Sequence, residues 1–269
     1  MPHKDILWAV AFSPDGKYLA TAGRSKIAHV WEASSGQEVA RMIHKLTVYD
    51  VAFSPELHGK YLLATASDDQ SAQVWELDST PEVACMFHGS KDIQTVNNKI
   101  VWGAVFSPDG KYLATASEDA TVRVWEWTTG QQVACLARDQ PFKSVAFSPD
   151  GEYLATASKS NLAWIWKWKD DSEKPIMSME HRCPIEDVAF SPNGDYVATA
   201  SKDGSVKLWG FAPRNEVKDK DLPHEGEVES VAFSPDGELL TAGSWDGIIL
   251  VWKVSTGELV KRWSHGISD

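Results

Sequence analysis

The sequence predicts an all-β fold assembled from six copies of one unit, and three observations carry this prediction. A stretch similar to "AFSPDGEYLATAS" occurs six times in the 269 residues. A Trp follows the Phe of each copy by 19 residues, or by 22 in the second copy, where three residues are inserted. No segment keeps an apolar period of 3.6 residues over ten residues, so we expect helix to be nearly absent.

Each unit of about 43 residues carries the signals of four strands in a fixed order. The first strand ends at the repeated Phe, found at Phe12, Phe53, Phe106, Phe147, Phe190 and Phe233. The Ser-Pro-Asp-Gly that follows is a turn signal, because Pro fixes φ and Asp and Gly suit the later turn positions. The second strand is of the type "YLATAS", the third ends in the Trp, and the fourth follows a loop, as in "GELVKRW" at 257–263.

Four antiparallel strands per unit, repeated radially, are typical of a β-propeller, in which each small sheet buries both faces against its neighbours. The pattern of a His, Phe-Ser-Pro-Asp-Gly, Ser-x-Asp and Val-Trp resembles the WD40-repeat family over residues 3–265. The usual closing Trp-Asp is Trp-Glu in the first three units, Trp-Lys at Trp166 and Trp252, and Trp-Gly at Trp209.

The resemblance implies a six-bladed WD40 β-propeller with four antiparallel strands per blade, in a single domain over residues 1–269. The blades are expected at about 3–44, 45–88, 89–138, 139–181, 182–224 and 225–265. We expect a closed ring and a monomer. The alternative is a piece of a longer array, completed by an absent segment or by assembly with another chain.

Composition excludes several classes of function. The formal charge of −12, with no cluster of basic residues, disfavours nucleic acid as a partner. The three cysteines have no CxxC spacing, and the N-terminus lacks a secretory signal. The longest apolar runs, such as "IILVW" at 248–252, are too short to span a bilayer. We expect a cytoplasmic protein that does not contact membranes.

The resemblance also implies a hydrogen-bond chain that stiffens each blade, from the Trp through a Ser or Thr and a His to a turn Asp. Three units supply complete sets: His44, Ser67, Asp69 and Trp75; His181, Ser201, Asp203 and Trp209; and His224, Ser244, Asp246 and Trp252. In the third unit the His is His88, just before an insertion at 89–97. The first and fourth units lack the set, so we expect these two blades to be softer.

We expect no catalytic residue, no metal site and no cofactor. The His, Ser and Asp sets recur beside a packed Trp, as structural groups would, and each turn offers one carboxylate where a calcium site needs several oxygens. The eight His residues show no HxH or HExxH spacing. One alternative remains: Asp50 and Asp187, on the innermost strands of opposite blades, would hold a cation or substrate in the central channel.

Comparison of the six units shows where a partner would dock. Four residues before the Phe the units have no structural consensus, so this position should be exposed: it holds Trp8, Tyr49, Trp102, Lys143, Glu186 and Glu229. The resemblance places it on the rim of the top face together with the residue before the turn Asp, which is Arg24, Asp68, Glu118, Lys159, Lys202 or Trp245. We expect an aromatic arc of Trp245, Trp8, Tyr49 and Trp102, opposite a charged side formed by the Lys and Glu residues.

The expected function is a non-enzymatic protein–protein interaction module or scaffold that docks partner proteins or peptides on this top face. The insertion at 89–97 would overhang the same face. The alternatives are an enzyme or small-ligand or ion binder that uses the central channel, and a scaffold without a partner of its own. A structural alternative also applies to the arc, in which Trp8 covers the seam of the ring and Trp102 packs beneath the insertion. The near-identity of the units resembles bacterial WD40 arrays that serve signalling proteins as sensors.

Overall fold

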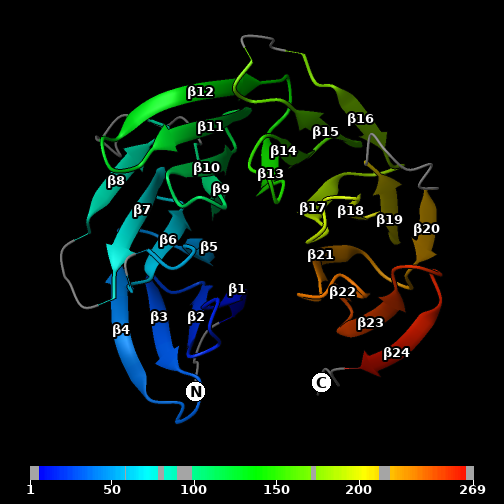
Figure 1. Cartoon of the computed structure of the whole chain (residues 1–269), viewed down its shortest axis with the longest axis horizontal. Coiled ribbons are helices and arrows are strands. Elements are labelled where there is room, and N and C mark those ends of the chain that lie inside the picture. The colour runs from blue at the N-terminus through cyan, green and yellow to red at the C-terminus, as the bar shows by residue number, and fades with distance from the viewer. Residues whose placement is uncertain are drawn as a thin grey trace. The chain divides into compact units, whose positions relative to one another are not determined.

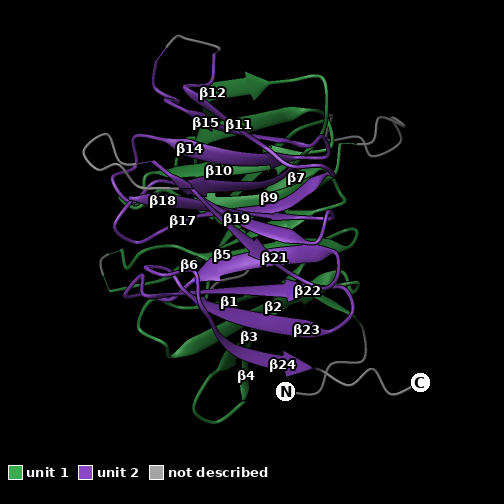
Figure 2. Ribbon diagram, turned by 90° about the vertical axis from the view of Figure 1, so that its right-hand side faces the viewer, with its two compact units in different colours: residues 1–142 green, residues 143–269 purple. Residues whose placement is uncertain are grey.

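The computed structural model describes residues 6–57, 59–77, 82–89, 99–170, 174–211 and 219–264. These residues form 24 strands and no helix, grouped into six sheets of four antiparallel strands. The prediction of an all-β propeller with six four-stranded blades is confirmed. The chain divides into two compact units, residues 1–142 and 143–269, which Figure 2 distinguishes by colour. The single-domain organisation stays a prediction.

Unit 1 contains the first three blades. Blade 1 comprises β1 (Leu7–Phe12), β2 (Tyr18–Gly23), β3 (Ile27–Glu32) and β4 (Glu38–Ile43). Blade 2 comprises β5 (Val48–Phe53), β6 (Leu62–Ser67), β7 (Ser71–Glu76) and β8 (Ala84–Phe87). Blade 3 comprises β9 (Val101–Phe106), β10 (Tyr112–Ser117), β11 (Thr121–Glu126) and β12 (Gln131–Ala137). In Figure 1 the first strands β1, β5 and β9 converge, while the fourth strands β4, β8 and β12 lie at the outer edges of the same sheets.

Unit 2 contains the other three blades. Blade 4 comprises β13 (Phe142–Phe147), whose first residue is the last of unit 1, with β14 (Leu154–Ser158), β15 (Leu162–Trp166) and β16 (Met177–Glu180). Blade 5 comprises β17 (Ile185–Phe190), β18 (Tyr196–Ser201), β19 (Ser205–Gly210) and β20 (Lys220–Pro223). Blade 6 comprises β21 (Val228–Phe233), β22 (Leu239–Ser244), β23 (Ile248–Lys253) and β24 (Leu259–Ser264). Each blade pairs its strands in chain order.

The Ser-Pro-Asp-Gly turns work as predicted from their chemistry. In blade 1 the Ser13 hydroxyl donates to Asp15 Oδ1 at 2.6 Å and accepts the backbone N–H of Tyr18 at 2.9 Å. Gly16 has φ +72°, a left-handed conformation that side chains disfavour. The side chains of the turn therefore satisfy its own backbone before any contact with another blade forms.

Neighbouring blades within a unit pack face to face through two unlike surfaces. One face of each sheet is lined by small residues, such as Ala20 and Ala22 in blade 1, and we call it the alanine face. The opposite face carries the repeated Trp, and we call it the tryptophan face. Both alanines are fully buried against the next blade's tryptophan face, which includes Val51, Leu63 and Trp75. Small residues on one side and large ones on the other let two twisted sheets approach closely.

A half-buried carboxylate ties adjacent first strands together in each unit. Asp50 on β5 accepts the backbone N–H of Ala104 on β9 at 3.0 Å, as well as that of Val51 at 2.8 Å. Asp187 on β17 likewise accepts the N–H of Val231 on β21 at 2.9 Å and the hydroxyl of Ser144 at 2.7 Å. Burial raises the pKa of Asp187 despite these hydrogen bonds. These carboxylates are engaged by the protein, so they do not form the free cation or substrate site considered from the sequence.

Removal of the carboxylate should loosen the contact between blades 2 and 3. Asp50→Ala leaves the N–H groups of Val51 and Ala104 without their acceptor, and we expect the free energy of unfolding to fall by about 2 kcal/mol. Ser230→Ala, at the equivalent but exposed position of β21, is the matched control and should change it by less than about 0.5 kcal/mol. Urea titration of both variants measures the difference. Equal stabilities of the two variants would contradict the structural role.

Candidate functional site

A β-bulge at the start of the first strand positions a residue whose type varies between the units. In blade 1 the pairing steps from Leu7↔Gly23 to Ala9↔Ala22, so Trp8 has no partner in the ladder. The same step passes over Tyr49 in blade 2 and Trp102 in blade 3. A bulged residue leaves the alternation of the strand and its side chain is re-aimed. The bulge therefore takes these aromatic side chains out of the sheet-to-sheet packing.

The three bulged aromatic residues of unit 1 lie side by side, and we call them the aromatic row. The ring centroids of Tyr49 and Trp102 are 4.5 Å apart at an interplanar angle of 47°, and those of Trp8 and Tyr49 are 6.4 Å apart at 44°. Trp8 is 45% exposed, whereas Tyr49 and Trp102 are half-buried. Three successive blades thus contribute to one aromatic surface, and the sequence predicted its members.

Two carboxylates lie beside the aromatic row, both at the position before the turn Asp. Glu118 Oε2 accepts the indole N–H of Trp102 at 2.6 Å. Asp68 is half-buried next to Tyr49, and its negative charge adds to burial in raising the pKa of the Tyr49 hydroxyl. Burial and the charge of Asp69 raise the pKa of Asp68 itself. The row is therefore bordered by partly desolvated negative charge.

In unit 2 the equivalent positions form a network of ion pairs. Lys143 Nζ lies 3.6 Å from Glu186 Oε2, and Lys202 Nζ lies 3.7 Å from Glu186 Oε1 and 4.0 Å from Glu229 Oε1. Burial opposes protonation of Lys202, but the surrounding carboxylates prevail and raise its pKa. The Lys and Glu residues of the predicted charged side thus contact each other directly within unit 2.

The expectation that the bulge position is exposed in every unit is wrong, because neighbours cover most of its side chains. Of its members only Trp8 is exposed, while Tyr49, Trp102, Lys143, Glu186 and Glu229 are half-buried. At the position before the turn Asp, Arg24, Lys202 and Trp245 are exposed and Lys159 is half-buried. Trp245 belongs to unit 2, where it is 69% exposed. Residues 90–97 of the predicted insertion lie outside the described residues.

The hydrogen-bond chain of the blades uses a threonine where the sequence analysis assigned a serine. In blade 2 the indole N–H of Trp75 donates to Thr65 Oγ1 at 2.9 Å, which lies 2.6 Å from His44 Nε2. His44 Nδ1 lies 3.0 Å from Asp69 Oδ2. Ser67 instead accepts the backbone N–H of Asp69 and donates to the carbonyl of Thr47. In blade 5 Thr199 likewise stands in the chain and the hydroxyl of Ser201 bonds to backbone.

Blade 3 forms the chain in full, through the histidine that precedes the insertion. His88 Nε2 lies 2.7 Å from Thr115 Oγ1, which accepts the indole N–H of Trp125 at 2.9 Å. His88 Nδ1 lies 3.3 Å from Asp119 Oδ2. Burial lowers the pKa of His88 although Asp119 opposes this shift. A neutral imidazole that donates from Nδ1 and accepts at Nε2 aligns all donors of the chain in one direction.

Blade 6 lacks the chain that the sequence analysis predicted for it. Its second strand contains "LTAGS" in place of the usual "LATAS", so Ala242 occupies the threonine position. His224 Nε2 is consequently buried without a hydrogen-bond partner. Nδ1 of the same ring accepts the backbone N–H of Glu225 at 3.0 Å, and Ser244 donates to Asp246. The exchange of Thr and Ala was visible in the sequence, and it is the signal that the analysis missed.

Blades 1 and 4, for which the sequence predicted no complete set, still form the link from the Trp to a Thr. Trp31 donates to Thr21 Oγ1 at 3.0 Å, and Trp166 donates to Thr156 Oγ1 at 2.9 Å. Gly23 replaces the usual Ser in blade 1, and a Cβ there would meet the carbonyl oxygen of Ile6 at 2.1 Å. The glycine is therefore needed for the entry of the chain into β1.

Six segments of the chain match the family model for the WD domain, G-beta repeat, at residues 1–32, 36–76, 90–126, 130–167, 173–210 and 219–253. The chain belongs to the WD40-repeat family. The matched WD40 repeats are offset from the blades, since the second one includes β4 of blade 1 together with β5, β6 and β7 of blade 2. No curated protein matches the chain.

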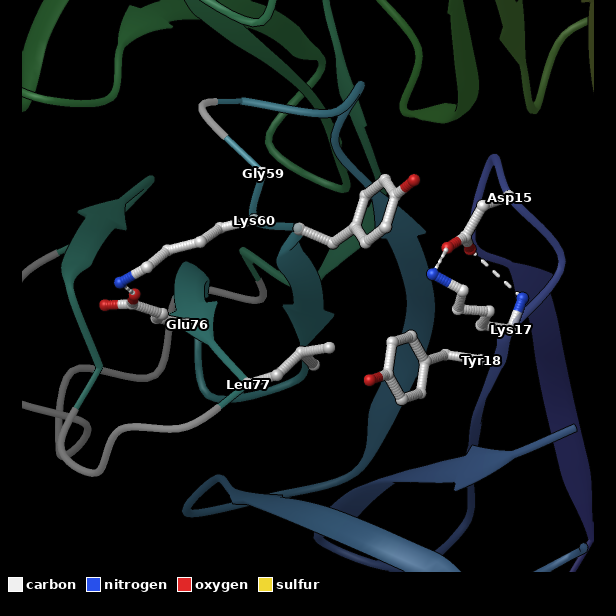
Figure 3. Close-up of a pocket in the computed structure, with 8 residues that line it drawn as sticks. Asp15, Lys17, Tyr18, Gly59, Lys60, Glu76 and Leu77 are labelled. Carbon is white, nitrogen blue, oxygen red and sulfur yellow. Dashed lines mark hydrogen bonds and ion pairs between the residues drawn. The ribbon is translucent and has the colours of Figure 1, made fainter.

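A pocket of about 150 Å³ lies between the turns of the first two WD40 blades (Figure 3). Its charged groups pair with each other: Lys17 Nζ lies 3.2 Å from Asp15 Oδ2, and Lys60 pairs with Glu76. Both lysine side chains are largely exposed to water. The pocket thus offers no unmatched charge, and we assign it no function.

Metal and redox sites find no support among the residues that the structure describes. No three His, Cys, Asp or Glu side chains gather there as metal ligands would. Cys85, Cys135 and Cys183 form no disulfide. No described segment forms a helix long and apolar enough to cross a membrane.

The first strand of blade 1 exposes a second set of apolar side chains. Leu7, Val10 and Phe12 are 42%, 63% and 64% exposed. Their equivalents on β5 pack on the alanine face of blade 1, and Val48 and Val51 are buried there. These positions belong to the sheet-packing surface of a WD40 blade, so we do not assign them to partner docking.

The hydrogen-bond chain should make the free energy of unfolding depend on pH in the acidic range. Burial alone would raise the pKa of Asp69, but hydrogen bonds from His44 and Ser71 outweigh it and lower the pKa to about 2, from 3.8. The stability that this carboxylate confers is present above pH 4 and is lost as pH falls from about 4 to about 2. Between pH 5 and pH 2 we expect the free energy of unfolding of wild type to fall by about 2 kcal/mol more than that of Asp69→Asn, because the asparagine cannot titrate.

Urea unfolding at several pH values measures this difference, and Asp139→Asn, at an exposed position, is the control that should follow wild type. Parallel pH profiles of wild type and Asp69→Asn would contradict the assignment of Asp69 to the chain.

Placing a threonine at position 242, as in the other blades, should stabilise blade 6. The double substitution Thr241→Ala with Ala242→Thr gives His224 Nε2 and Trp252 the hydroxyl that the other blades have, and should raise the free energy of unfolding by about 1 kcal/mol. Thr199→Ala, which imposes the defect of blade 6 on blade 5, should lower it by about 1–3 kcal/mol. Amide hydrogen exchange locates each change. A double variant no more stable than wild type would refute the role given to the threonine.

Proposed function

We propose that the protein is a non-enzymatic interaction module that docks partner proteins or peptides on the rim formed by its bulged residues, with the aromatic row as the main contact. The observation that carries this proposal is the alignment of Trp8, Tyr49 and Trp102 across three successive blades. Aromatic side chains supply large contact areas with few rotatable bonds, and Trp and Tyr dominate the binding energy of protein interfaces.

The repeat itself does not require aromatic residues at this position, which supports a functional reason for them. In unit 2 the same position is occupied by Lys143, Glu186 and Glu229. Those blades form the same four-stranded sheets with the same bulge at Glu186 and Glu229. Since the bulge tolerates either chemistry, the aromatic row is explained by contact with a partner.

Trp245 supplies a second contact within unit 2 in this proposal. It is the most exposed large apolar side chain among the described residues, and its backbone N–H is fixed by the carbonyl of Glu227 at 2.9 Å. A rigid backbone beneath an exposed indole limits the entropy lost on binding. We also propose a cytoplasmic location, supported by three cysteines that form no disulfide, and a signalling role of the kind expected from bacterial arrays.

An enzyme or an ion binder that uses the central strands is less well supported. The carboxylates of Asp50 and Asp187 accept backbone N–H groups of neighbouring strands. The histidines of blades 2, 3 and 5 are buried in the hydrogen-bond chain and none of them lies beside an exposed nucleophile. We therefore favour recognition over catalysis.

Substitution of the rim tryptophans tests this function. Trp8→Ala, Trp102→Ala and Trp245→Ala together should remove the partners that wild type captures from its native lysate, while the sheets fold unchanged. Trp263→Ala is the matched control, because Trp263 is as exposed as Trp8 but lies on the outer strand β24. Circular dichroism and a thermal unfolding curve establish folding. Capture that survives in the folded triple variant would refute docking on the rim.

A further inference from the structure

We propose that the aromatic row and the Asp68 carboxylate together bind a cationic side chain, an arginine or a lysine, of the docked partner. This inference rests on the proposed docking function and gives it a chemical class of ligand. It is carried by the juxtaposition of the aromatic row, a carboxylate without a donor among the described residues, and the corresponding positions in unit 2.

The aromatic row has the geometry for a cation. Tyr49 and Trp102 are inclined at 47° with centroids 4.5 Å apart, so their faces are offset and do not cover each other fully. A guanidinium or ammonium is attracted to the face of an aromatic ring within about 6 Å of its centroid. Glu118 accepts the indole N–H of Trp102, and this bond places more electron density on the ring that a cation would contact.

Asp68 supplies the negative charge. It is half-buried beside Tyr49, and no side chain of the described residues donates a hydrogen bond to its carboxylate or forms an ion pair with it. Its neighbour Asp69 is fully engaged by His44 and by the backbone N–H of Lys45. A partly desolvated carboxylate without a donor is unfavourable unless a ligand supplies one.

The cations near this rim do not neutralise Asp68. Lys99 Nζ donates to the carbonyl of His88, and neither Arg24 nor Lys45 makes an ion pair with Asp68. The whole chain carries a formal charge of −12, which further favours a basic partner over an acidic one.

In unit 2 a lysine of the chain itself lies among the side chains of the bulge position. Blade 5 has Lys202 where blade 2 has Asp68. Lys202 Nζ lies within 4.0 Å of the carboxylates of Glu186 and Glu229, both at the bulge position. In unit 1 aromatic residues hold the bulge position and acidic residues hold the other position in blades 2 and 3, while Arg24 of blade 1 makes no ion pair with Asp68. Among the described residues the positive charge beside Asp68 is therefore missing. We infer that the partner provides it.

A peptide pair tests the inference directly. The probe is a nine-residue Gly/Ser peptide with blocked ends and one central arginine, and the reference is the same peptide with citrulline, which keeps the shape and removes the charge. Titration is followed by NMR of the tryptophan indole N–H signals at low salt. We expect the arginine peptide to bind about tenfold more tightly than the citrulline peptide.

Variants identify the groups responsible. Asp68→Asn and Trp102→Phe should each reduce the affinity for the arginine peptide by about fivefold or more, while Glu227→Gln, on the rim of unit 2, should leave it unchanged. Equal affinity for the two peptides, or an arginine affinity unaltered by Asp68→Asn, would overturn the inference.

The failure of this inference is distinguishable from the failure of docking itself. If the triple tryptophan variant loses its partners and Asp68→Asn retains them, docking on the rim stands and cation recognition by Asp68 is wrong. If the arginine peptide binds wild type with the expected preference but the triple variant still captures partners, cation binding stands and rim docking is wrong.

Discussion

The contact between an alanine face and a tryptophan face is the interaction on which the rest of the structure depends. A four-stranded sheet of this size is too small to be stable alone, and each blade becomes stable only when both faces are covered. Ala20 and Ala22 beneath Trp75 and Leu63 show how this is done: fully buried small residues let the bulky layer of the next blade approach the backbone. The Asp50 carboxylate then joins the first strands of blades 2 and 3 by accepting the N–H of Ala104.

That packing explains why a polar chain is buried in blades 2, 3 and 5. The repeated Trp brings an indole N–H into the interior, and a threonine on the neighbouring strand supplies its acceptor, with a histidine and an aspartate completing the chain. Each member satisfies the next, so the chain stabilises only when it is whole. Blade 6 shows the reverse case, because one exchange of Thr and Ala leaves His224 Nε2 unpaired.

The proposed function depends on the bulge, which removes one residue of the first strand from the ladder in blades 1, 2, 3, 5 and 6. Sheet-to-sheet contact keeps positions such as Val48 and Val51 apolar, whereas the bulge position holds Trp, Tyr, Lys or Glu. In unit 1 these residues stack on each other, and in unit 2 they form ion pairs. The same backbone device therefore presents two different chemistries, and beside the first lies Asp68, a carboxylate that has neither a donor nor an ion pair among the described residues.

The sequence by itself determined the number of blades, their strand order, the turns and the variable rim positions, since these follow from local chemistry repeated at a fixed period. It did not identify Thr65 over Ser67 as the bridging hydroxyl, because residues two apart on a strand share a face and only the pairing register decides which lies beneath the Trp. Tertiary structure alone decided that Tyr49 lies against Trp102, that Asp50 and Asp187 accept backbone N–H groups of the next blade, and that Lys143 meets Glu186. Those contacts join different blades, and their distances depend on how the sheets pack.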